Sequence, residues 1–309
     1  MSNLVLIFVS LICGYLFRRT DRLPATTSQA LNSFIIFMSL PALVLLQITN
    51  LFKTLEFQWN YLLPISMPWI VFGLSWLFFS QLGRKRNWTR ARTGALILIS
   101  GLGNTSFVGI PLLEGIVGPE AVAWGVLIDQ LGSFLVLSTL GLLVASLYGK
   151  SRGVARSPLR QTLSFPPFIA LVIALALGVN RLSFEGVTGE ILQRLSLTLV
   201  PLALFSVGFQ LKLNLSTLKR YLRPLSLSLL YKMIFCPLFF LSLVWILRIE
   251  IDLVTRVMIL EAAMATMITS AVVVSEFSLD EELANLMVGV SILISLASVP
   301  LWDKLIAIL

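Results

Sequence analysis

Apolar residues fill ten long runs of this chain, and short polar segments that carry most of the charged residues separate the runs. A helix that crosses a lipid bilayer needs about 17 to 25 mostly apolar residues. The pattern therefore predicts ten transmembrane helices and an all-α integral membrane fold. The predicted spans cover residues 4–17, 28–50, 59–80, 94–113, 120–146, 163–179, 191–210, 222–246, 257–275 and 283–302.

The fourth predicted span is interrupted by polar and helix-breaking residues. Its segment 101–111 reads GLGNTSFVGIP, which places Gly103 and Asn104 inside an apolar run and Pro111 seven residues after Asn104. Hydrocarbon offers no partner to freed backbone groups, so a break at this depth is stable only where it faces protein or water. Discontinuous helices are typical of transport sites. We therefore expect the fourth helix to be broken near the middle of the bilayer.

The two halves of the chain repeat this pattern. The segment SLPALVL around Pro41 and the segment LVPLALF around Pro201 place prolines 160 residues apart in the second and seventh spans. The same interval moves the break at residues 104–109 to residues 264–269 of the ninth span, where residues 265–270 read ATMITS. Each half holds five spans, an odd number, so the second half must be inverted relative to the first.

This repeat predicts two inverted five-helix units in which broken helices 4 and 9 cross near the midplane. The expected domains are the first inverted repeat at residues 1–147, a cytoplasmic connecting loop at 148–162 and the second inverted repeat at 163–309.

Composition agrees with a membrane protein: 57% of the residues are hydrophobic and 12% are charged, with a mean hydropathy of +0.94. Soluble domains carry about 25% charged residues. The run at 4–17 is followed by Arg18 and Arg19, and no small-residue cleavage site follows it, so we interpret it as the first span and not as a signal peptide.

The distribution of Lys and Arg predicts the orientation, because cytoplasmic loops are enriched in both. With the N-terminus outside, sixteen of the 23 Lys and Arg residues fall in cytoplasmic loops and six fall on the opposite side. We therefore expect both termini on the non-cytoplasmic side, with the plasma (inner) membrane as the location. The net charge of +8 reflects this loop bias, and no nucleic-acid partner is expected.

The two breaks are the candidate substrate site. Half-helix N-termini attract anions and half-helix C-termini attract cations, and hydroxyl or amide side chains add hydrogen bonds at less cost than a buried charge. An alternative is that these small residues only allow close helix packing. The candidate binding residues are Gly103, Asn104, Thr105, Ser106 and Pro111 in the fourth span, with Thr266, Thr269 and Ser270 in the ninth.

Three ionisable residues lie inside predicted spans and are candidates for energy coupling. Asp129 lies in the fifth span, Glu261 in the ninth and Lys232 in the eighth. Asp129 or Glu261 is a candidate carrier of a coupling proton. Lys232 is a candidate partner of one of them in a structural ion pair, or a candidate ligand of a substrate carboxylate.

Several motifs resemble the auxin efflux carrier family, which includes the plant PIN proteins and compact bacterial relatives. The resemblance extends over essentially the whole chain and includes GNTSFVGIPLL at 103–113, Gly118, Asp129, the early Leu40-Pro41-Ala42 signature and Glu261-Ala262-Ala263-Met264. The chain departs from the family pattern at Ala265 and Ser270, where family members carry prolines. That departure puts the break of the ninth span in question.

The resemblance implies an elevator-type secondary transporter for small organic anions such as carboxylates. It assigns spans 1, 2, 6 and 7 to a scaffold that forms a homodimer, and spans 3–5 and 8–10 to a moving transport domain. The alternative is an anion channel or a membrane receptor that uses the same broken-helix pocket.

An enzymatic function is not expected. The chain contains no histidine, it lacks a glycine-rich phosphate loop, and its two cysteines, Cys13 and Cys236, lie far apart in predicted spans. Zinc hydrolases and serine hydrolases therefore lack their usual residues. We expect neither a cofactor nor a metal, and the expected partners are the anion, membrane lipid and a second copy of the chain.

Overall fold

The computed structural model describes residues 2–54, 61–149, 165–210 and 215–308, and every regular element within these ranges is a helix. The elements of the first half are α1 (Ser2–Arg19), α2 (Thr27–Phe34), η1 (Ile35–Ser39), α3 (Leu40–Thr54), α4 (Leu62–Lys85), α5 (Arg90–Gly101), η3 (Thr105–Gly109), α6 (Ile110–Ile116), α7 (Glu120–Leu127), η4 (Ile128–Phe134), η5 (Leu137–Gly141) and α8 (Leu142–Tyr148). Those of the second half are α10 (Pro166–Val179), α11 (Gly186–Ser196), α12 (Leu199–Gln210), α13 (Leu215–Leu230), η6 (Tyr231–Phe235), α14 (Cys236–Ile246), α15 (Leu253–Ala262), α16 (Ile268–Glu276) and α17 (Glu281–Ile306).

The all-helical membrane fold expected from the sequence is confirmed. Each of the ten apolar runs contains helix, and within the described residues six helices are long and apolar enough to cross a membrane. Two shorter apolar helices, 105–116 and 166–179, lie in the fourth and sixth runs. Most of the expected connecting loop at 148–162 lies outside the described residues.

Side-chain caps define where the helices that carry the two breaks begin. Thr89 accepts a hydrogen bond from the backbone N–H of Arg92 at the start of α5, and Asp252 accepts one from the N–H of Thr255 at the start of α15. Such caps satisfy N–H groups that have no partner inside the helix. Both half-helices are therefore anchored at the ends that lie away from the crossing.

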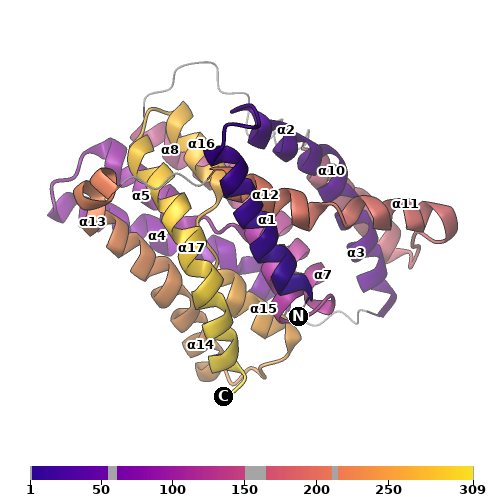
Figure 1. The fold of residues 1–309 in the computed structure, drawn as a ribbon. Coiled ribbons are helices and arrows are strands. Elements are labelled where there is room, and N and C mark those ends of the chain that lie inside the picture. The colour runs from indigo at the N-terminus through magenta and orange to yellow at the C-terminus, as the bar shows by residue number, and fades with distance from the viewer. Residues whose placement is uncertain (1, 55–60, 150–164, 211–214, 309) are drawn as a thin grey trace.

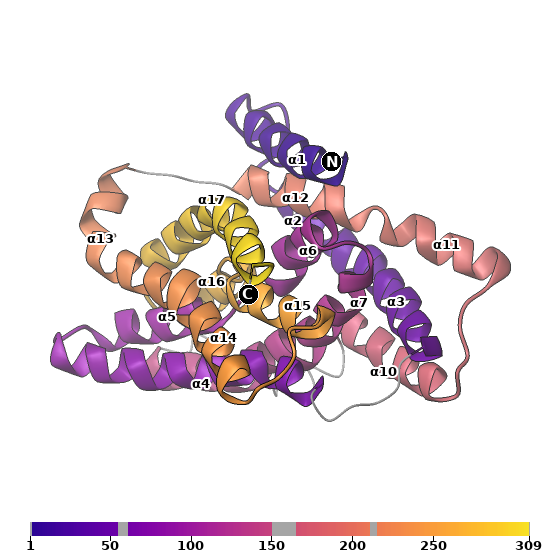
Figure 2. The ribbon, with the colours of Figure 1, turned by 90° about the horizontal axis from the view of Figure 1, so that it is seen from below.

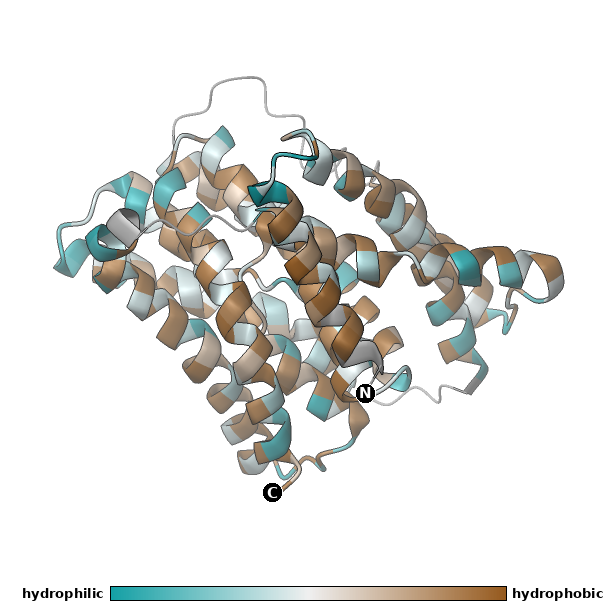
Figure 3. Ribbon diagram, in the orientation of Figure 1, coloured by the Kyte–Doolittle hydropathy of each residue, from teal (hydrophilic) through white to brown (hydrophobic). Residues whose placement is uncertain are grey.

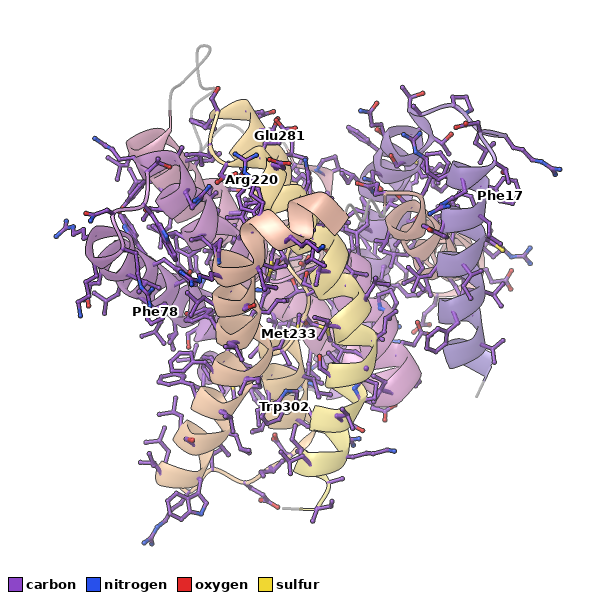
Figure 4. All side chains as sticks on the ribbon, turned by 60° about the vertical axis from the view of Figure 1, so that its left-hand side comes forward. Phe17, Phe78, Arg220, Met233, Glu281 and Trp302 are labelled. Atoms are coloured by element: carbon purple, nitrogen blue, oxygen red, sulfur yellow. The ribbon has the colours of Figure 1, made fainter. Side chains whose placement is uncertain are left out.

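Three π-helical turns stand directly before an X–Pro pair. η1 precedes Leu40-Pro41, η3 precedes Ile110-Pro111 and η6 precedes Cys236-Pro237. Proline has no N–H, so the carbonyl four residues before it loses its helical partner. At Pro237 that carbonyl belongs to Met233, and Trp302 Nε1 donates a hydrogen bond to it at 2.8 Å. Figure 4 shows Trp302 of α17 near Met233.

The helices pack in two groups. In the first group, α1 lies against α12, and α3 lies against α10 and α11. In the second, α4 packs on α5, α14 on α15, and both α13 and α16 on α17. Figure 2 shows α1, α12, α11, α3 and α10 along one side of the molecule and α4, α5, α13 and α14 along the other. The broken segment formed by η3 and α6 lies between them, in contact with α12 and α1.

The outer helical surface is apolar between two polar ends. Val5, Phe8 and Ile12 of α1 are about half exposed, as are Val172 and Ile173 of α10. Figure 3 shows brown, hydrophobic ribbon along the lengths of α1 and α17 and teal, hydrophilic residues mainly at the helix ends. The start of α1 and the end of α17 lie at the same end of the molecule (Figure 1). This distribution is typical of helices that face lipid.

Ion pairs tie the second helix group together at both ends. Arg92 of α5 binds Asp280, the N-cap of α17, at 2.9 Å, and the hydroxyl of Tyr221 in α13 donates to the same carboxylate at 2.9 Å. At the opposite end of α17, Asp303 binds Arg256 of α15 at 2.7 Å. α17 therefore connects both half-helices α5 and α15 from outside the crossing.

Candidate functional site

The two breaks cross and pair with each other through their backbones. α5 ends at Gly101, and Leu102 and Met267 are both extended. The N–H of Asn104 donates to the carbonyl of Ala265 at 2.7 Å, and the N–H of Met267 donates to the carbonyl of Leu102 at 3.1 Å. These bonds form an isolated antiparallel bridge between Gly103 and Thr266. Each break therefore supplies the partners that the other lacks.

Thr266 holds the crossing and does not line a cavity. Its N–H donates to Ser291 Oγ at 3.0 Å, and its hydroxyl donates to the carbonyl of Ile99 at 2.8 Å. The side chain is fully buried. Ser270 is also buried, and its hydroxyl donates to the carbonyl of Met267 at the start of its own helix. Gly103, Thr266 and Ser270 thus support the geometry of the breaks.

Asn104 closes the first turn after the break in the fourth span. Its Oδ1 accepts hydrogen bonds from the N–H groups of Phe107 at 3.1 Å and Val108 at 3.3 Å. Its Nδ2 has no hydrogen-bond partner among the described residues, although the side chain is only 1% exposed. A buried donor without a partner costs about 1–3 kcal/mol. Such a group at a cavity wall is therefore a candidate ligand contact.

A cavity of about 140 Å³ lies on the side of the crossing that Asn104 faces. Two half-helices begin at its wall: η3 with the α6 that follows it, and α16, whose N-cap Met267 has no side-chain cap. Both helix N-termini, which carry partial positive charge, therefore adjoin the same space. The lining residues are Ile36, Leu40, Asn104, Ser106, Phe107, Asp129, Gln130, Phe134, Leu137, Ser138, Leu142, Phe165, Met267, Ile268, Thr269 and Val273.

Asp129 is buried at the cavity wall with both carboxylate oxygens hydrogen-bonded. The hydroxyl of Thr105 donates to its Oδ1, and Gln130 Nε2 donates to its Oδ2 at 2.7 Å. The carbonyl oxygen of the Gln130 side chain has no partner among the described residues. The cavity therefore presents an unpartnered donor on Asn104 and an unpartnered acceptor on Gln130.

A lysine lies on the other side of the crossing, where the half-helices α5 and α15 end. The Nζ of Lys232 donates to the carbonyl of Ser100 at 3.3 Å, in the last turn of α5, and the side chain is 1% exposed. A Cβ placed on Gly103 would lie 3.8 Å from this Nζ and 3.8 Å from the carbonyl oxygen of Glu261, in the last turn of α15. A cation is stabilised where two helix C-termini meet. Within the described residues, Lys232 makes no ion pair with Asp129 or Glu261.

Glu261 lies away from the cavity wall. Its carboxylate fits against Gly109 and Gly125, where an added Cβ would meet a carboxylate oxygen at 2.8 Å and 3.3 Å respectively. Both oxygens lack a hydrogen-bond partner among the described residues.

A second cavity, of about 230 Å³, lies on the other side of the crossing. It includes Pro111 and Glu114 of α6, Gln47 of α3 and Gln193 of α11. Its wall from the fifth span is formed at residues 119–122, whereas the first cavity follows residues 129–142 of that span. The two cavities therefore lie along different parts of the same span.

The structure separates the residues singled out in the sequence into three sets. Asn104, Ser106, Thr269 and Asp129 line the first cavity, with Thr105 bound to Asp129. Pro111 lines the second cavity. The third set lies at the crossing itself: Gly103, Thr266 and Ser270 hold its backbone, and Lys232 and Glu261 lie beside it. Sequence reasoning missed Gln130, although an amide beside Asp129 in an apolar span was a readable signal.

The family model described as membrane transport protein matches residues 1–303 of this chain. The chain belongs to this family of membrane transport proteins. The match confirms the resemblance to auxin efflux carriers, and it makes this transport protein a multi-pass integral membrane protein. An uncharacterized transporter of Methanothermobacter thermautotrophicus is 27% identical over 298 residues, which cover 96% of this chain and 95% of the relative. An uncharacterized transporter of Methanocaldococcus jannaschii is 25% identical over 315 residues, covering 98% of this chain and 97% of the relative.

Proposed function

We propose that this membrane transport protein is a secondary carrier that moves small organic anions, such as carboxylates, through the first cavity. The observation that carries the proposal is the meeting of two half-helix N-termini and the unpartnered Nδ2 of Asn104 at one wall. A carboxylate accepts hydrogen bonds from amide N–H groups and is attracted by the partial charge of helix N-termini. Lys232 lies on the far side of the crossing, beside carbonyls at the ends of both half-helices, where a cation would be stabilised.

The size of the cavity favours a compact anion. Its volume of about 140 Å³ is well below the roughly 300–1,000 Å³ of pockets that hold drug-sized ligands. The aromatic rings of Phe107, Phe134 and Phe165 form part of the wall and provide an apolar surface for the carbon skeleton. A short mono- or dicarboxylate fits this combination.

Contacts at a nearly constant sequence interval support the ten-helix inverted repeat. The hydroxyls of Ser39 and Thr198, 159 positions apart, are 2.7 Å from each other. The hydroxyl of Tyr231 donates to the carbonyl of Val71, 160 positions away, at 2.7 Å. Residues at equivalent positions of two repeats meet where they lie on the pseudo-twofold axis that relates the repeats. The bridge between Gly103 and Thr266 lies close to the same interval.

The two helix groups correspond to an elevator arrangement. The group that contains α1, α3, α10, α11 and α12 would be the scaffold, which would also form the homodimer. The group that contains α4, α5 and α13 to α17, together with the fifth span, would carry the site across the plasma membrane. The two cavities at different positions along the fifth span are consistent with alternating access. Both termini would lie on the non-cytoplasmic side.

Counterflow tests the carrier directly. Purified protein in liposomes loaded with unlabelled malonate should take up labelled malonate transiently above equilibrium, and the initial rate should saturate. A panel of malate and an aromatic carboxylate defines the substrate class. Unitary currents without counterflow would show a channel, and saturable binding without flux would show a receptor. Either result would contradict the carrier.

A further inference from the structure

Glu261 occupies a notch that is built for a carboxyl group but not for a charge. The side chain is 1% exposed, and it fits against the bare backbones of Gly109 and Gly125. Neither carboxylate oxygen has a hydrogen-bond partner among the described residues. An ionised carboxylate in a low-dielectric interior needs donors or a counter-ion, and without them the neutral acid is the stable form. Asp129, by contrast, accepts hydrogen bonds on both oxygens.

The charged surroundings of Glu261 do not supply a counter-ion at its carboxylate. Asp129 of η4 lies close enough to interact electrostatically with Glu261, with the same sign of charge. Lys232 of η6 lies at the backbone carbonyl of residue 261 and makes no ion pair with Glu261 within the described part of the chain. The other ionisable residues of the elements packed on α15 and of the neighbouring α6 are Arg84, Lys85, Glu114, Glu120, Cys236, Glu281, Glu282, Lys304 and Asp303, the last bound to Arg256.

The notch is connected to the substrate cavity through one short stretch of backbone. Gly109, which contacts the Glu261 carboxylate, donates its N–H to the carbonyl of Asn104 at 2.9 Å. Asn104 is the residue whose free Nδ2 lies at the cavity wall. The Glu261 carboxylate therefore contacts one end of the π-helical turn η3, and an anion in the cavity would contact the other end.

We propose that Glu261 is the proton-binding site of this carrier, so that one proton moves together with each anion. The inference rests on the proposed anion carrier and names its coupling ion. The proton adds to the Glu261 carboxylate on one side of the membrane and leaves from the same oxygen on the other. The carboxylates of Asp129 and Glu261 would both repel an incoming anion, and protonation of Glu261 removes one of these two negative charges. Anion binding and proton binding favour each other reciprocally.

A pH gradient across liposomes tests the coupling at zero membrane potential. Wild-type protein should accumulate labelled malonate when the interior is alkaline, and an inward sodium gradient should not replace the pH gradient. Glu261→Gln is neutral at every pH. The malonate accumulation that a pH gradient drives should be about tenfold lower in this variant than in wild type. The malonate exchange rate of the variant should no longer vary between mildly acidic and neutral pH. Glu276→Gln, which changes an exposed carboxylate at the end of α16, should behave as wild type.

A second measurement covers the case in which Glu261→Gln does not fold. Because the notch favours the neutral acid, proton uptake is measured over a series of pH values that extends to alkaline pH. Malonate added to weakly buffered wild-type protein in detergent should cause an uptake of protons that rises toward one proton per anion bound as Glu261 ionises in the unloaded protein, after correction for the protonation of malonate itself. Accumulation by Glu261→Gln that still follows the pH gradient would overturn the inference. Drive by sodium instead of pH, or binding without proton uptake, would do the same. Wild-type exchange without pH dependence would overturn the proton site alone, whereas no exchange of any carboxylate would overturn the carrier as well.

Discussion

The two breaks have similar geometry but very different sequences. The break in the fourth span contains Gly103 and Asn104 and is followed by Pro111, all of which disfavour or end a helix. The break in the ninth span, residues 263–267, reads AMATM and contains neither glycine nor proline. Both segments are nevertheless non-helical where they cross. Local helix propensity is therefore sufficient to explain the first break, whereas the second depends on its partners.

Tertiary hydrogen bonds replace the helical ones at the second break. Met267 donates to Leu102, Ala265 accepts from Asn104, and Thr266 bonds to both Ile99 and Ser291. Since an unsatisfied backbone group inside a membrane costs several kcal/mol, a stretch such as AMATM can leave the helix only where such partners exist. The first break thus acts as the template on which the second one forms.

The largest difference between the two breaks is expected in the transport rates of variants at their cavity-lining residues. Asn104→Ala removes the cap of two N–H groups and the free donor at the cavity, so transport should fall by about 100-fold. Thr269→Ala, on the other side of the cavity, should reduce transport by less than about tenfold, because there the backbone N-terminus of α16 provides the main contact. Initial rates of malonate exchange measure both.

Equal losses at the two positions would contradict this division of roles. Thermal unfolding of both variants in detergent separates a binding defect from misfolding. The cap of Asn104 alone is worth about 1–2 kcal/mol. A larger loss of stability in Asn104→Ala would indicate that the amide holds the fold and not the ligand.

The next effect concerns stability, and it is expected from Met267→Pro. Met267 has a φ of −62°, which proline adopts without strain. The substitution removes the hydrogen bond from the Met267 N–H to Leu102 and the buried Met267 side chain, whereas Met267→Ala removes only the side chain. The carbonyl of Leu102 lacks its donor in the proline variant, so its free energy of unfolding should lie about 2–3 kcal/mol below that of Met267→Ala. The midpoint of thermal unfolding in detergent reports this change. A midpoint equal to that of Met267→Ala would show that the bridge is not needed for the crossing.

Thr266→Val should cost less, because it keeps the shape of the side chain and the backbone bond to Ser291. Only the hydroxyl bond to the carbonyl of Ile99 is lost, which corresponds to about 1–2 kcal/mol of unfolding free energy. Thr269→Val is the matched control, since Thr269 lies at the cavity and is exposed. If Thr269→Val destabilises the protein as much as Thr266→Val, the Ile99 bond does not explain the effect.

The apolar runs were sufficient to locate helical segments and the break in the fourth span, whereas the residues of the ninth span left its break open. The fourth-span break is visible in its residues, and the ninth was found only by moving it along the chain by 160 positions. The sequence could not show which candidates line a cavity, because that depends on how the half-helices cross. Thr266 and Ser270 turned inward to support the backbone, whereas Gln130 entered the cavity wall. An ion pair of Lys232 was equally open from sequence, since only the crossing places its Nζ at helix carbonyls.

The smallest effect is expected at Ala265, where the resemblance to auxin efflux carriers implies a proline. Its carbonyl accepts the bond from Asn104, which proline preserves, and its own N–H donates no backbone bond outside regular helices within the described residues. Ala265→Pro should therefore leave the crossing intact and change the free energy of unfolding by less than about 1 kcal/mol, with any gain coming from a less flexible unfolded chain. Thermal unfolding compared with Met267→Pro, two positions along, checks this. A large loss at both positions would mean that the ninth break needs a backbone shape that proline forbids. A loss at Met267 alone would show that the pairing, and not the residue type, breaks this helix.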